Sequence, residues 1–591
     1  MPEKAKVNQL SNRAVPQSSG INPSISSRLE MLAILEFMDE YTAETSSTFE
    51  SSLQNPFLNM TTHLIRQHLE AKLITATSLV AASGVPYATA KRRLQEMIDA
   101  GLVEQRPRTR TGKSFSLHPS VKMFENWTQF CQRLRQIASL TFDSNQGVRK
   151  ARDYYYGGSY LSSARTIQPL PVMSEPLKLP GGLRVMVHGD PTFMAMDSLK
   201  RQFVQVIGCD IHQRAFSIDR LRKEALENAL RPTSKYDIIA VDLPWIGEFA
   251  EKKVLMPLDQ VLDIESLDPD DFHAAGWQAA HYDQRLYGVP SQTTPELLFY
   301  RRDLFKEAGL NPPRTTDELL HAAQKLHRPD QGRYGIAWNA ARGTALGHTF
   351  IMACSDFGQP VLNLNKINGH FDAFNLKGQN FRPMINTPTG LQAAEYLLEL
   401  MRFSPPDILS MSWFERIQPY AAGKVAMAYG YTILAPYFEL DTNSPAFQKT
   451  DYLPHPSGHN GAPIAPVGGF VLGIPNNLPE KRQAMAAKAL TAFTSPEAQK
   501  LYVLNGSRTA PRYSVGSDPE INSLSPIFQA VDTMSWRDEL QYWPRPPVLQ
   551  ITEIIKVCGE VFHDMSRGNI ILKQAVIEVQ KRSDPVMSGL G

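Results

Sequence analysis

Apolar residues change their spacing along the chain, and this change divides it into two parts. Up to about residue 142 they recur at intervals of three and four, as in "FLNMTTHLIRQHLEAK", which predicts the face of a helix. From about residue 183 onward, short apolar runs such as "YDIIAVD" and "GGFVLGIP" alternate with helical patterns. Alternating strands and helices are typical of α/β domains. We therefore expect a helical N-terminal part and a larger α/β part.

The N-terminal part contains a characteristic order of elements. Helices are expected at about 28–45 and 57–73, then at "TATSLVAASG", with Thr75 or Thr77 as N-cap, and at "VPYATAKRRLQEMIDAG". The β-prone runs "LVEQRPR" and "KSFSLHP" flank "TRTG", which predicts a hairpin. A further helix is expected at about 121–140. This order indicates a helix-turn-helix followed by a wing.

This order resembles the winged helix-turn-helix of MarR-like bacterial regulators over about residues 57–120, most closely in "ATAKRRLQEMIDAGLVEQR". The helix from Pro86 keeps an apolar face and leaves polar residues free for base edges, and the hairpin is rich in arginine for phosphate contacts. The candidate DNA-binding residues are Tyr87, Thr89, Lys91, Arg92, Arg93, Arg106, Arg108, Arg110 and Lys113. The structural alternative is a solvated basic helix with a surface hairpin.

A single winged helix makes few contacts with DNA, so such regulators pair around a two-fold axis. The helices at 28–45 and 121–140 are the candidate dimerisation elements. The alternative for Phe124 and Trp127 is intramolecular packing against 57–73. The expected partners are therefore operator DNA and a second copy of the chain.

Composition and charge limit the classes of protein to which the chain can belong. The net charge is +2, so any nucleic-acid surface must be local. Four distant cysteines give neither a disulfide framework nor a zinc pattern. Residues 1–27 are expected to be disordered and contain no secretory apolar region, and no run of 18 apolar residues occurs. These features predict a cytosolic protein without membrane contact. Residues 143–182, dense in Pro and Gly, are expected to be a linker.

Strand ends in the larger part carry carboxylates and aromatic rings. "RVMVHGD" ends in His188 and Asp190, "IIAVDLPW" in Asp242 and Trp245, and "KVAMAYGYT" in Tyr431. Ligands of α/β sheets sit at the carboxyl ends of strands. Carboxylates accept hydroxyl hydrogen bonds and flat rings cover C–H faces, so this chemistry favours a sugar.

Four stretches, "YDIIAVDLPWIGEF", "YGVPSQTTPELLFYRRDLF", "PYAAGKVAMAYGYT" and "VGGFVLGIPNNLPEKRQAM", resemble extracellular solute-binding proteins of carbohydrate importers over about 183–585. The resemblance implies two α/β lobes joined by hinge strands, with ligand in the cleft. "GVPSQTTPELLFYRRDLF" is the expected first hinge crossing and "GSRTAPRYS" a later one.

The ligand-contacting positions that the resemblance implies come from loops in both lobes, and about half of them are expected to touch ligand. They are His188, Asp190, Asp242, Trp245, Thr294, Glu296, Trp338, Arg342, Trp413, Glu415, Tyr431, Gly468, Gly469, Arg508 and Trp543. Alternatively, Trp338 is a core residue, Arg508 belongs to an ion pair, and Gly468–Gly469 is a tight turn.

No enzymatic motif accompanies these residues. The P-loop, H-E-x-x-H, G-x-S-x-G and strand-to-helix G-x-G-x-x-G patterns are missing from the sequence, and nothing places Asp242 and Glu415 at a glycosidase separation. We therefore expect no catalysis, cofactor or metal.

The domains expected are 1–27 (disordered), 28–142 (winged helix), 143–182 (linker) and 183–591 (two-lobed sensor). The function predicted from them is a cytosolic, ligand-responsive transcription regulator, in which lobe closure on a sugar changes DNA binding. One alternative is the substrate-binding component of a carbohydrate ABC transporter with an N-terminal interaction module. Another is a DNA-binding protein whose solute module serves only for oligomerisation.

Overall fold

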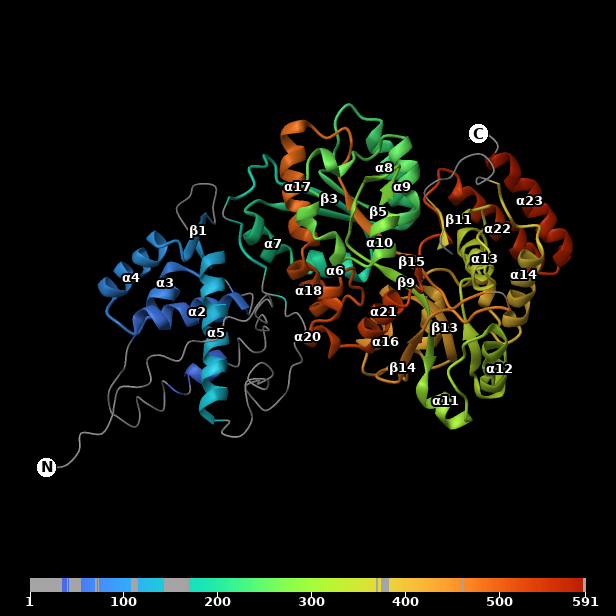
Figure 1. The fold of residues 1–591 in the computed structure, drawn as a ribbon, viewed down its shortest axis with the longest axis horizontal. Coiled ribbons are helices and arrows are strands. Elements are labelled where there is room, and N and C mark those ends of the chain that lie inside the picture. Colours follow the sequence, from blue (N-terminus) through green and yellow to red (C-terminus); the bar gives the residue numbers. More distant parts are fainter. Residues whose placement is uncertain are drawn as a thin grey trace.

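The computed structural model describes residues 34–39, 41, 55–69, 72, 74–107, 115–142, 167, 170–173, 175–367, 370–373, 382–459 and 461–587 (Figure 1). The predictions for residues 1–27 and for most of the expected linker lie outside these residues.

The N-terminal module, residues 56–142, has the expected order of elements. Helices α2 (Pro56–Leu69), α3 (Ala76–Ala81) and α4 (Tyr87–Asp99) are followed by antiparallel strands β1 (Val103–Pro107) and β2 (Phe115–Pro119), and then by α5 (Val121–Phe142). Thr75 caps α3 in a reciprocal capping box with Ser78. The module has its own apolar core, which includes Leu64, Leu94, Phe124 and Trp127. Phe124 and Trp127 thus pack inside the module, so they are not a free dimerisation face.

The N-terminal module contacts the larger domain through a segment that composition predicts as linker. The buried guanidinium of Arg106 donates to the carbonyl of Met173. The Met173 and Leu177 amides donate in turn to Val206 and Ile207 at 3.0 and 2.8 Å. Leu170, Leu177 and Leu179 are buried in the core of the larger domain. Prolines hide the periodicity of this segment, but its apolar side chains still pack, so residues 170–182 belong to the larger domain.

The first lobe is built on a five-stranded sheet in the order β4-β3-β5-β16-β8. Strands β3 (Leu183–His188), β4 (Ile211–Phe216) and β5 (Ile238–Asp242) are parallel, and β16 (Phe470–Gly473) runs antiparallel beside β5, with β8 (Val289–Pro290) at the edge. Its helices include α6 (Pro191–Ser198), α7 (Lys200–Ile207), α8 (Ile218–Ala229), α9 (Ile246–Glu251), α17 (Glu480–Thr494) and α18 (Pro496–Leu504).

The second lobe surrounds the long buried strand β9 (Thr294–Arg301). Its sheet has the order β10-β13-β9-β15-β17, and β14 also pairs with β9. The other strands are β10 (Tyr334–Ala337), β13 (Val425–Tyr431), β14 (Thr450–Leu453), β15 (Ala465–Gly468) and β17 (Leu540–Gln541). Helices α11 (Arg302–Ala308), α12 (Thr316–Leu326), α13 (Thr344–Asp356), α14 (Pro388–Met401), α22 (Ile551–Ser566) and α23 (Leu572–Met587) belong to this lobe.

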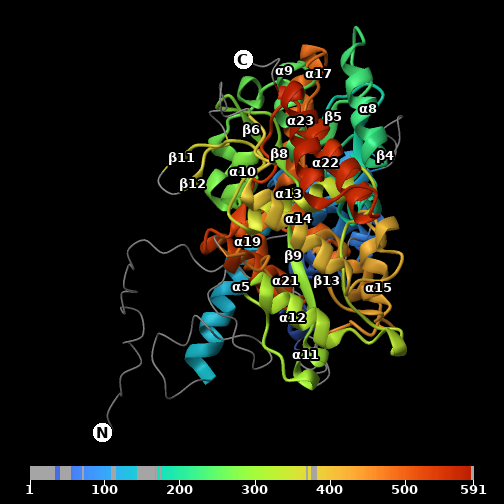
Figure 2. The ribbon, with the colours of Figure 1, turned by 90° about the vertical axis from the view of Figure 1, so that its right-hand side faces the viewer.

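Helices α13 and α22 lie side by side, and their backbones come into close contact (Figure 2). A Cβ at Gly347 of α13 would collide with the Ile555 carbonyl, and one at Gly559 of α22 would collide with the Gly343 carbonyl. Glycine at both positions permits this approach. The pair brings the first turns of both helices to one place, which is the cleft described below.

The chain crosses between the two sheets at residues 291–293, from β8 to β9, where the first hinge crossing is expected, and again at Gly469, between β15 and β16. Gly469 has a φ of 121°, and a Cβ there would lie 2.6 Å from the Gln292 carbonyl oxygen, so this crossing needs glycine. The segment "GSRTAPRYS" leads from α18 toward α21 (Pro526–Trp536), which packs against β14 of the second lobe. This path matches the later crossing predicted there.

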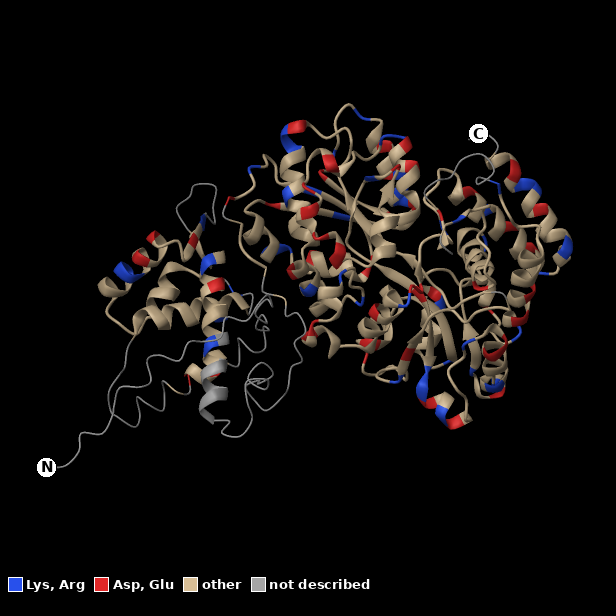
Figure 3. Ribbon diagram, viewed as in Figure 1, with Lys and Arg blue, Asp and Glu red and all other residues tan. Residues whose placement is uncertain are grey.

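Charged residues of both signs are interspersed over the helices of both lobes (Figure 3). Cys131, Cys209, Cys354 and Cys558 form no disulfide bond among the described residues. None of the helices in the described ranges has the length and apolar character needed to cross a membrane.

Candidate ligand-binding site

A cavity of about 320 Å³ lies where the two lobes meet. The first lobe contributes the ends of β3 and β5 and the start of β16, and the second contributes β9, β13, α13 and α22. Sites for small ligands have volumes of about 300–1,000 Å³, so this cavity suits a ligand at the small end of that range.

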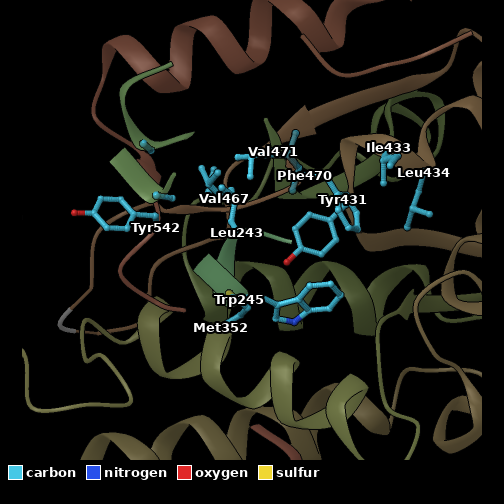
Figure 4. Close-up of a cluster of buried hydrophobic side chains, with 14 of the residues drawn as sticks. Leu243, Trp245, Met352, Tyr431, Ile433, Leu434, Val467, Phe470, Val471 and Tyr542 are labelled. Atoms are coloured by element: carbon cyan, nitrogen blue, oxygen red, sulfur yellow. The ribbon is translucent and has the colours of Figure 1, made fainter. Parts of the chain in front are cut away.

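Aromatic rings from both lobes form the cavity walls. Trp245 follows β5 in the first lobe, and Tyr431 ends β13 in the second (Figure 4). The His188 ring stacks on Phe470 at a centroid distance of 4.9 Å, and it also faces Phe414 of the other lobe at 6.4 Å. Flat apolar faces of this kind cover the C–H surface of a sugar or polyol.

Asp242 is the buried carboxylate of the cavity. It ends β5, and burial raises its pKa, against the opposing charges of Arg545 and His188. The nearest cation is Arg545, whose Nη1 lies 3.9 Å from Asp242 Oδ2. That separation is long for a direct hydrogen bond. The Asp242 carboxylate therefore retains capacity to accept hydrogen bonds from ligand hydroxyls.

Arg545 enters the cavity from a proline-rich segment between β17 and α22. Its Nη2 donates to the Val467 carbonyl at 3.3 Å, and its guanidinium lies 5.8 Å from the Tyr431 ring centroid. Its Nε has no hydrogen-bond partner among the described residues. Buried donors are almost always paired in folded proteins, so this atom is suited to a ligand acceptor.

Asp190 holds the first-lobe side of the site in place. Its Oδ1 caps α6 by accepting from the amides of Thr192 and Phe193, and it also accepts from Gln292 Nε2 at 3.0 Å. Its Oδ2 lies 3.0 Å from His188 Nδ1. Asp190 thus orients His188 and Gln292, two residues that line the cavity.

Of the positions predicted to contact ligand, the cavity brings together His188, Asp242, Trp245, Thr294, Trp413, Tyr431 and Gly469. The others lie outside its lining: Asp190, Glu296, Trp338, Arg342, Glu415, Gly468, Arg508 and Trp543.

Several of the residues outside the lining make hydrogen bonds or ion pairs within the protein. Trp338 is fully buried and donates to Ser404 Oγ at 2.9 Å, and Arg508 pairs with Glu439 at 2.5 Å, as the alternatives predict. Glu415 is exposed and accepts from the Ser412 amide, so it forms no carboxylate pair with Asp242 in the cavity.

The remaining four residues outside the lining also have partners or close neighbours in the protein. Trp543 packs on Phe371 with ring centroids 4.5 Å apart, and the half-exposed Arg342 faces Asp564 of α22 at 3.4 Å. Gly468 is a close-approach position, because a Cβ there would lie 2.7 Å from Arg545 Nη2. Glu296 is buried behind the cavity wall in an ion pair with Arg416.

Sequence reasoning missed several lining residues, notably Gln292, His348, Phe470 and Arg545. His348 lies in the apolar helical run "TALGHTFIMAC", where a single histidine gives no signal of a site. Arg545 follows Trp543 by two residues, and an arginine between two prolines was the available signal. The other missed residues are Ile218, Asp219, Arg222, Pro244, Thr344, Phe414, Ile433, Leu434, Thr552 and Ile555.

The predicted DNA-binding face is only partly available. Tyr87, Lys91 and Arg92 are exposed on α4, and Thr89 and Arg93 are half-buried. Arg106 points inward, and burial lowers its pKa to about 10, so this residue cannot track phosphates as predicted. Arg108, Arg110 and Lys113 lie outside the described residues.

No cluster of three or more potential metal ligands occurs within the described ranges.

Comparison with known proteins identifies the larger part. Residues 222–500 match the family model "Bacterial extracellular solute-binding protein". The C-terminal part of the chain is a solute-binding protein module. The module has the two-lobed α/β fold, since a solute-binding protein from Agrobacterium radiobacter K84, in complex with ribitol, superposes with a TM-score of 0.62 at 22% identity, over 70% of this chain and all of that one. A solute-binding protein from Agrobacterium vitis S4 with bound D-mannitol superposes with a TM-score of 0.58 at 18% identity, over 69% of this chain and 99% of that one.

Two curated relatives have names that state a ligand. The maltotriose-binding protein of Pyrococcus abyssi is 31% identical over 135 residues, which is 22% of this chain and 28% of the relative. The mannitol-binding protein of Pseudomonas aeruginosa is 25% identical over 248 residues, 42% of this chain and 52% of the relative. The matches thus span between about a quarter and a half of these relatives.

These findings correct the main functional prediction. A cytosolic, DNA-binding transcription regulator is wrong, because the matched family is extracellular and the relatives are sugar- and polyol-binding proteins. Operator DNA is wrong as the partner for the same reason, and nothing supports the predicted homodimer. The transporter alternative agrees better with the matches. The expectation of a binding protein that is not an enzyme is confirmed, since the relatives are binding proteins.

Proposed function

We propose that the chain is the substrate-binding component of a sugar or polyol ABC importer and that its ligand occupies the cavity between the lobes. The observation that carries this proposal is the cavity itself. It combines the buried carboxylate of Asp242, the unpaired Nε of Arg545 and aromatic rings from both lobes. Maltotriose, mannitol and ribitol, named for the similar proteins, are the first ligands to test.

The cavity offers both a hydrogen-bond acceptor and a hydrogen-bond donor, and together they select the ligand. A sugar hydroxyl is at once a donor and an acceptor, so adjacent hydroxyls can donate to Asp242 and accept from Arg545. The hinge crossings at residues 291–293 and Gly469 allow the lobes to close over the ligand. Closure requires that the ligand bind the closed arrangement more tightly than the open one.

The N-terminal module, residues 56–142, serves in this proposal as an interaction module with a winged-helix fold. Support for the fold comes from the order of three helices, hairpin and helix around a separate apolar core. Hydrogen exchange on the full chain tests it: amides of α2, α4 and α5 should exchange as one cooperative unit. Independent exchange of these helices would contradict a single folded module.

A thermal-shift screen of the full chain against ribitol, D-mannitol and maltotriose tests the binding function. A ligand at a hundredfold excess over its Kd stabilises the folded state by about 2.7 kcal/mol. The Asp242→Ala variant should lose the shift, and Glu415→Ala, at an exposed position, should keep it. Absence of any shift in the folded wild type across a wider panel of sugars and polyols would contradict the proposal.

A further inference from the structure

His348 lies at the boundary between the cavity and a buried charged cluster. It is on α13, lines the cavity together with Thr344 one turn earlier, and is 1% exposed. Its Nε2 lies 3.0 Å from Tyr431 Oη and 3.3 Å from Glu296 Oε2. Its Nδ1 has no hydrogen-bond partner among the described residues. Within the described residues, Nε2 therefore has protein partners, whereas Nδ1 is a buried nitrogen without one.

The cluster behind His348 fixes which nitrogen carries the proton. Burial would raise the pKa of Glu296, but the charge of Arg416, with which it pairs, and the histidines beside it hold that pKa well below the ordinary value. Glu296 is thus an ionised carboxylate, which can only accept. Burial lowers the pKa of His348 to about 4, so the ring is neutral at pH 7 and carries one proton. Because the Glu296 carboxylate, 3.3 Å from Nε2, can only accept, it favours the tautomer that carries the proton on Nε2 and leaves the lone pair on Nδ1.

We propose that His348 accepts a hydrogen bond from a ligand hydroxyl through Nδ1, and that Glu296, held by Arg416, is a positioning residue that fixes this tautomer. This inference rests on the proposed binding function. It adds a hydroxyl acceptor on the second lobe to the Asp242 carboxylate on the first. A ligand would then be gripped through hydroxyl groups from both sides, and an analogue lacking the hydroxyl at His348 would bind less tightly.

Two substitutions separate the two ring nitrogens. The amide of asparagine reaches the position of Nδ1, whereas that of glutamine reaches the position of Nε2. With ribitol, D-mannitol and maltotriose as calorimetric probes, His348→Asn should keep the wild-type Kd within about threefold, and His348→Gln should weaken it about tenfold, as expected for one lost hydrogen bond. The reverse order, or equal affinities, would overturn the proposal. His321→Asn, at an exposed histidine of α12 outside the cavity lining, is the control and should keep its affinity.

A double-mutant cycle tests the positioning role of Glu296. Glu296→Gln should weaken binding about tenfold in the wild type and have little further effect in His348→Gln, because both changes remove the same interaction. Additive losses would indicate that Glu296 acts only through general stability.

Neutron diffraction from crystals of the wild-type protein provides a test that needs neither a variant nor a ligand. The expected result is a deuteron on Nε2 of His348 and none on Nδ1, whereas a deuteron on Nδ1 would overturn the inference. If none of the three probes binds the wild type, the proposed ligand class fails, and the neutron result still decides the tautomer.

Discussion

At the scale of single residues, the cavity lining contains two opposite charges beside flat aromatic rings. Asp242 and Arg545 are opposite charges held 3.9 Å apart, and the rings of Trp245 and Tyr431 lie in the same lining. Because these two charges are of opposite sign, the lining carries no excess charge from this pair. The balance of this pair is in keeping with the uncharged, hydroxyl-rich ligand proposed above.

The first prediction concerns the aromatic wall. Trp245→Ala should weaken binding of whichever probe shifts the melting temperature by about tenfold or more, because the C–H face of the ligand loses its apolar partner. Trp536→Ala is the matched control, since Trp536 is 69% exposed and lies outside the cavity lining. Calorimetric titration measures both, and an unchanged Kd in Trp245→Ala would place the ligand elsewhere.

A second prediction follows from His68, which is half-buried beside Phe124 in the N-terminal module. Burial lowers its pKa from 6.5 to about 4. Between these values the unfolded chain binds a proton at His68 that the folded chain does not, so stability falls as the pH falls through this window. Replacing His68 with Phe should make the melting temperature less dependent on pH between 7 and 5. His321→Phe, at an exposed histidine, is the control, and equal pH dependence in His68→Phe and wild type would refute the assignment.

At the scale of elements, the cavity depends on how α13 and α22 pack. Thr344 and His348 on α13, and Thr552 and Ile555 on α22, line it from adjacent turns. Their arrangement follows from the contacts at Gly347 and Gly559, where backbone meets backbone. Helix packing directly behind the cavity lining thereby fixes the second-lobe wall of the site.

Gly559→Ala is therefore predicted to destabilise the chain by about 1–3 kcal/mol, because the added Cβ overlaps the Gly343 carbonyl. The melting temperature should fall by a few degrees and ligand affinity should fall with it. Lys556→Ala alters the same helix at a half-exposed side chain and should change neither. Wild-type stability in Gly559→Ala would mean that the two helices can separate without cost.

The sequence predicts the parts of the site that lie at strand ends. Asp242, Trp245 and Tyr431 end or follow short continuous apolar runs, and the geometry of α/β sheets places such residues at the cleft. His348, Thr552 and Ile555 lie on helices whose apolar pattern looks like ordinary core, so only the tertiary packing reveals them. Glu296 and Trp338 carry the right chemistry but face the interior of the second lobe, which one-dimensional periodicity does not distinguish.

At the scale of the whole molecule, the solute-binding module carries an additional folded part on its first lobe. Arg106 of the N-terminal module donates to Met173, and a Cβ at Gly208, the C-cap of α7, would lie 2.9 Å from Arg106 Nη1. The N-terminal module is thus attached to the first lobe near α7. Any partner bound to it would follow the motion of that lobe.

Arg106→Ala should weaken this attachment, because the Met173 carbonyl and the buried surface around α7 lose their partner. Limited proteolysis between the N-terminal module and the first lobe should become several-fold faster, while ligand affinity stays unchanged. Arg92→Ala, which removes an exposed arginine near Glu96, is the control. Unchanged cleavage in Arg106→Ala would show that other contacts hold the N-terminal module.

The most direct test of the proposed function is isothermal titration calorimetry of the full chain with ribitol, D-mannitol and maltotriose, alongside Asp242→Ala. We expect saturable binding of at least one of them with a stoichiometry near one, and an affinity reduced tenfold or more in Asp242→Ala. Binding that is unaffected by Asp242→Ala would contradict the assignment of the cavity between the lobes as the ligand site.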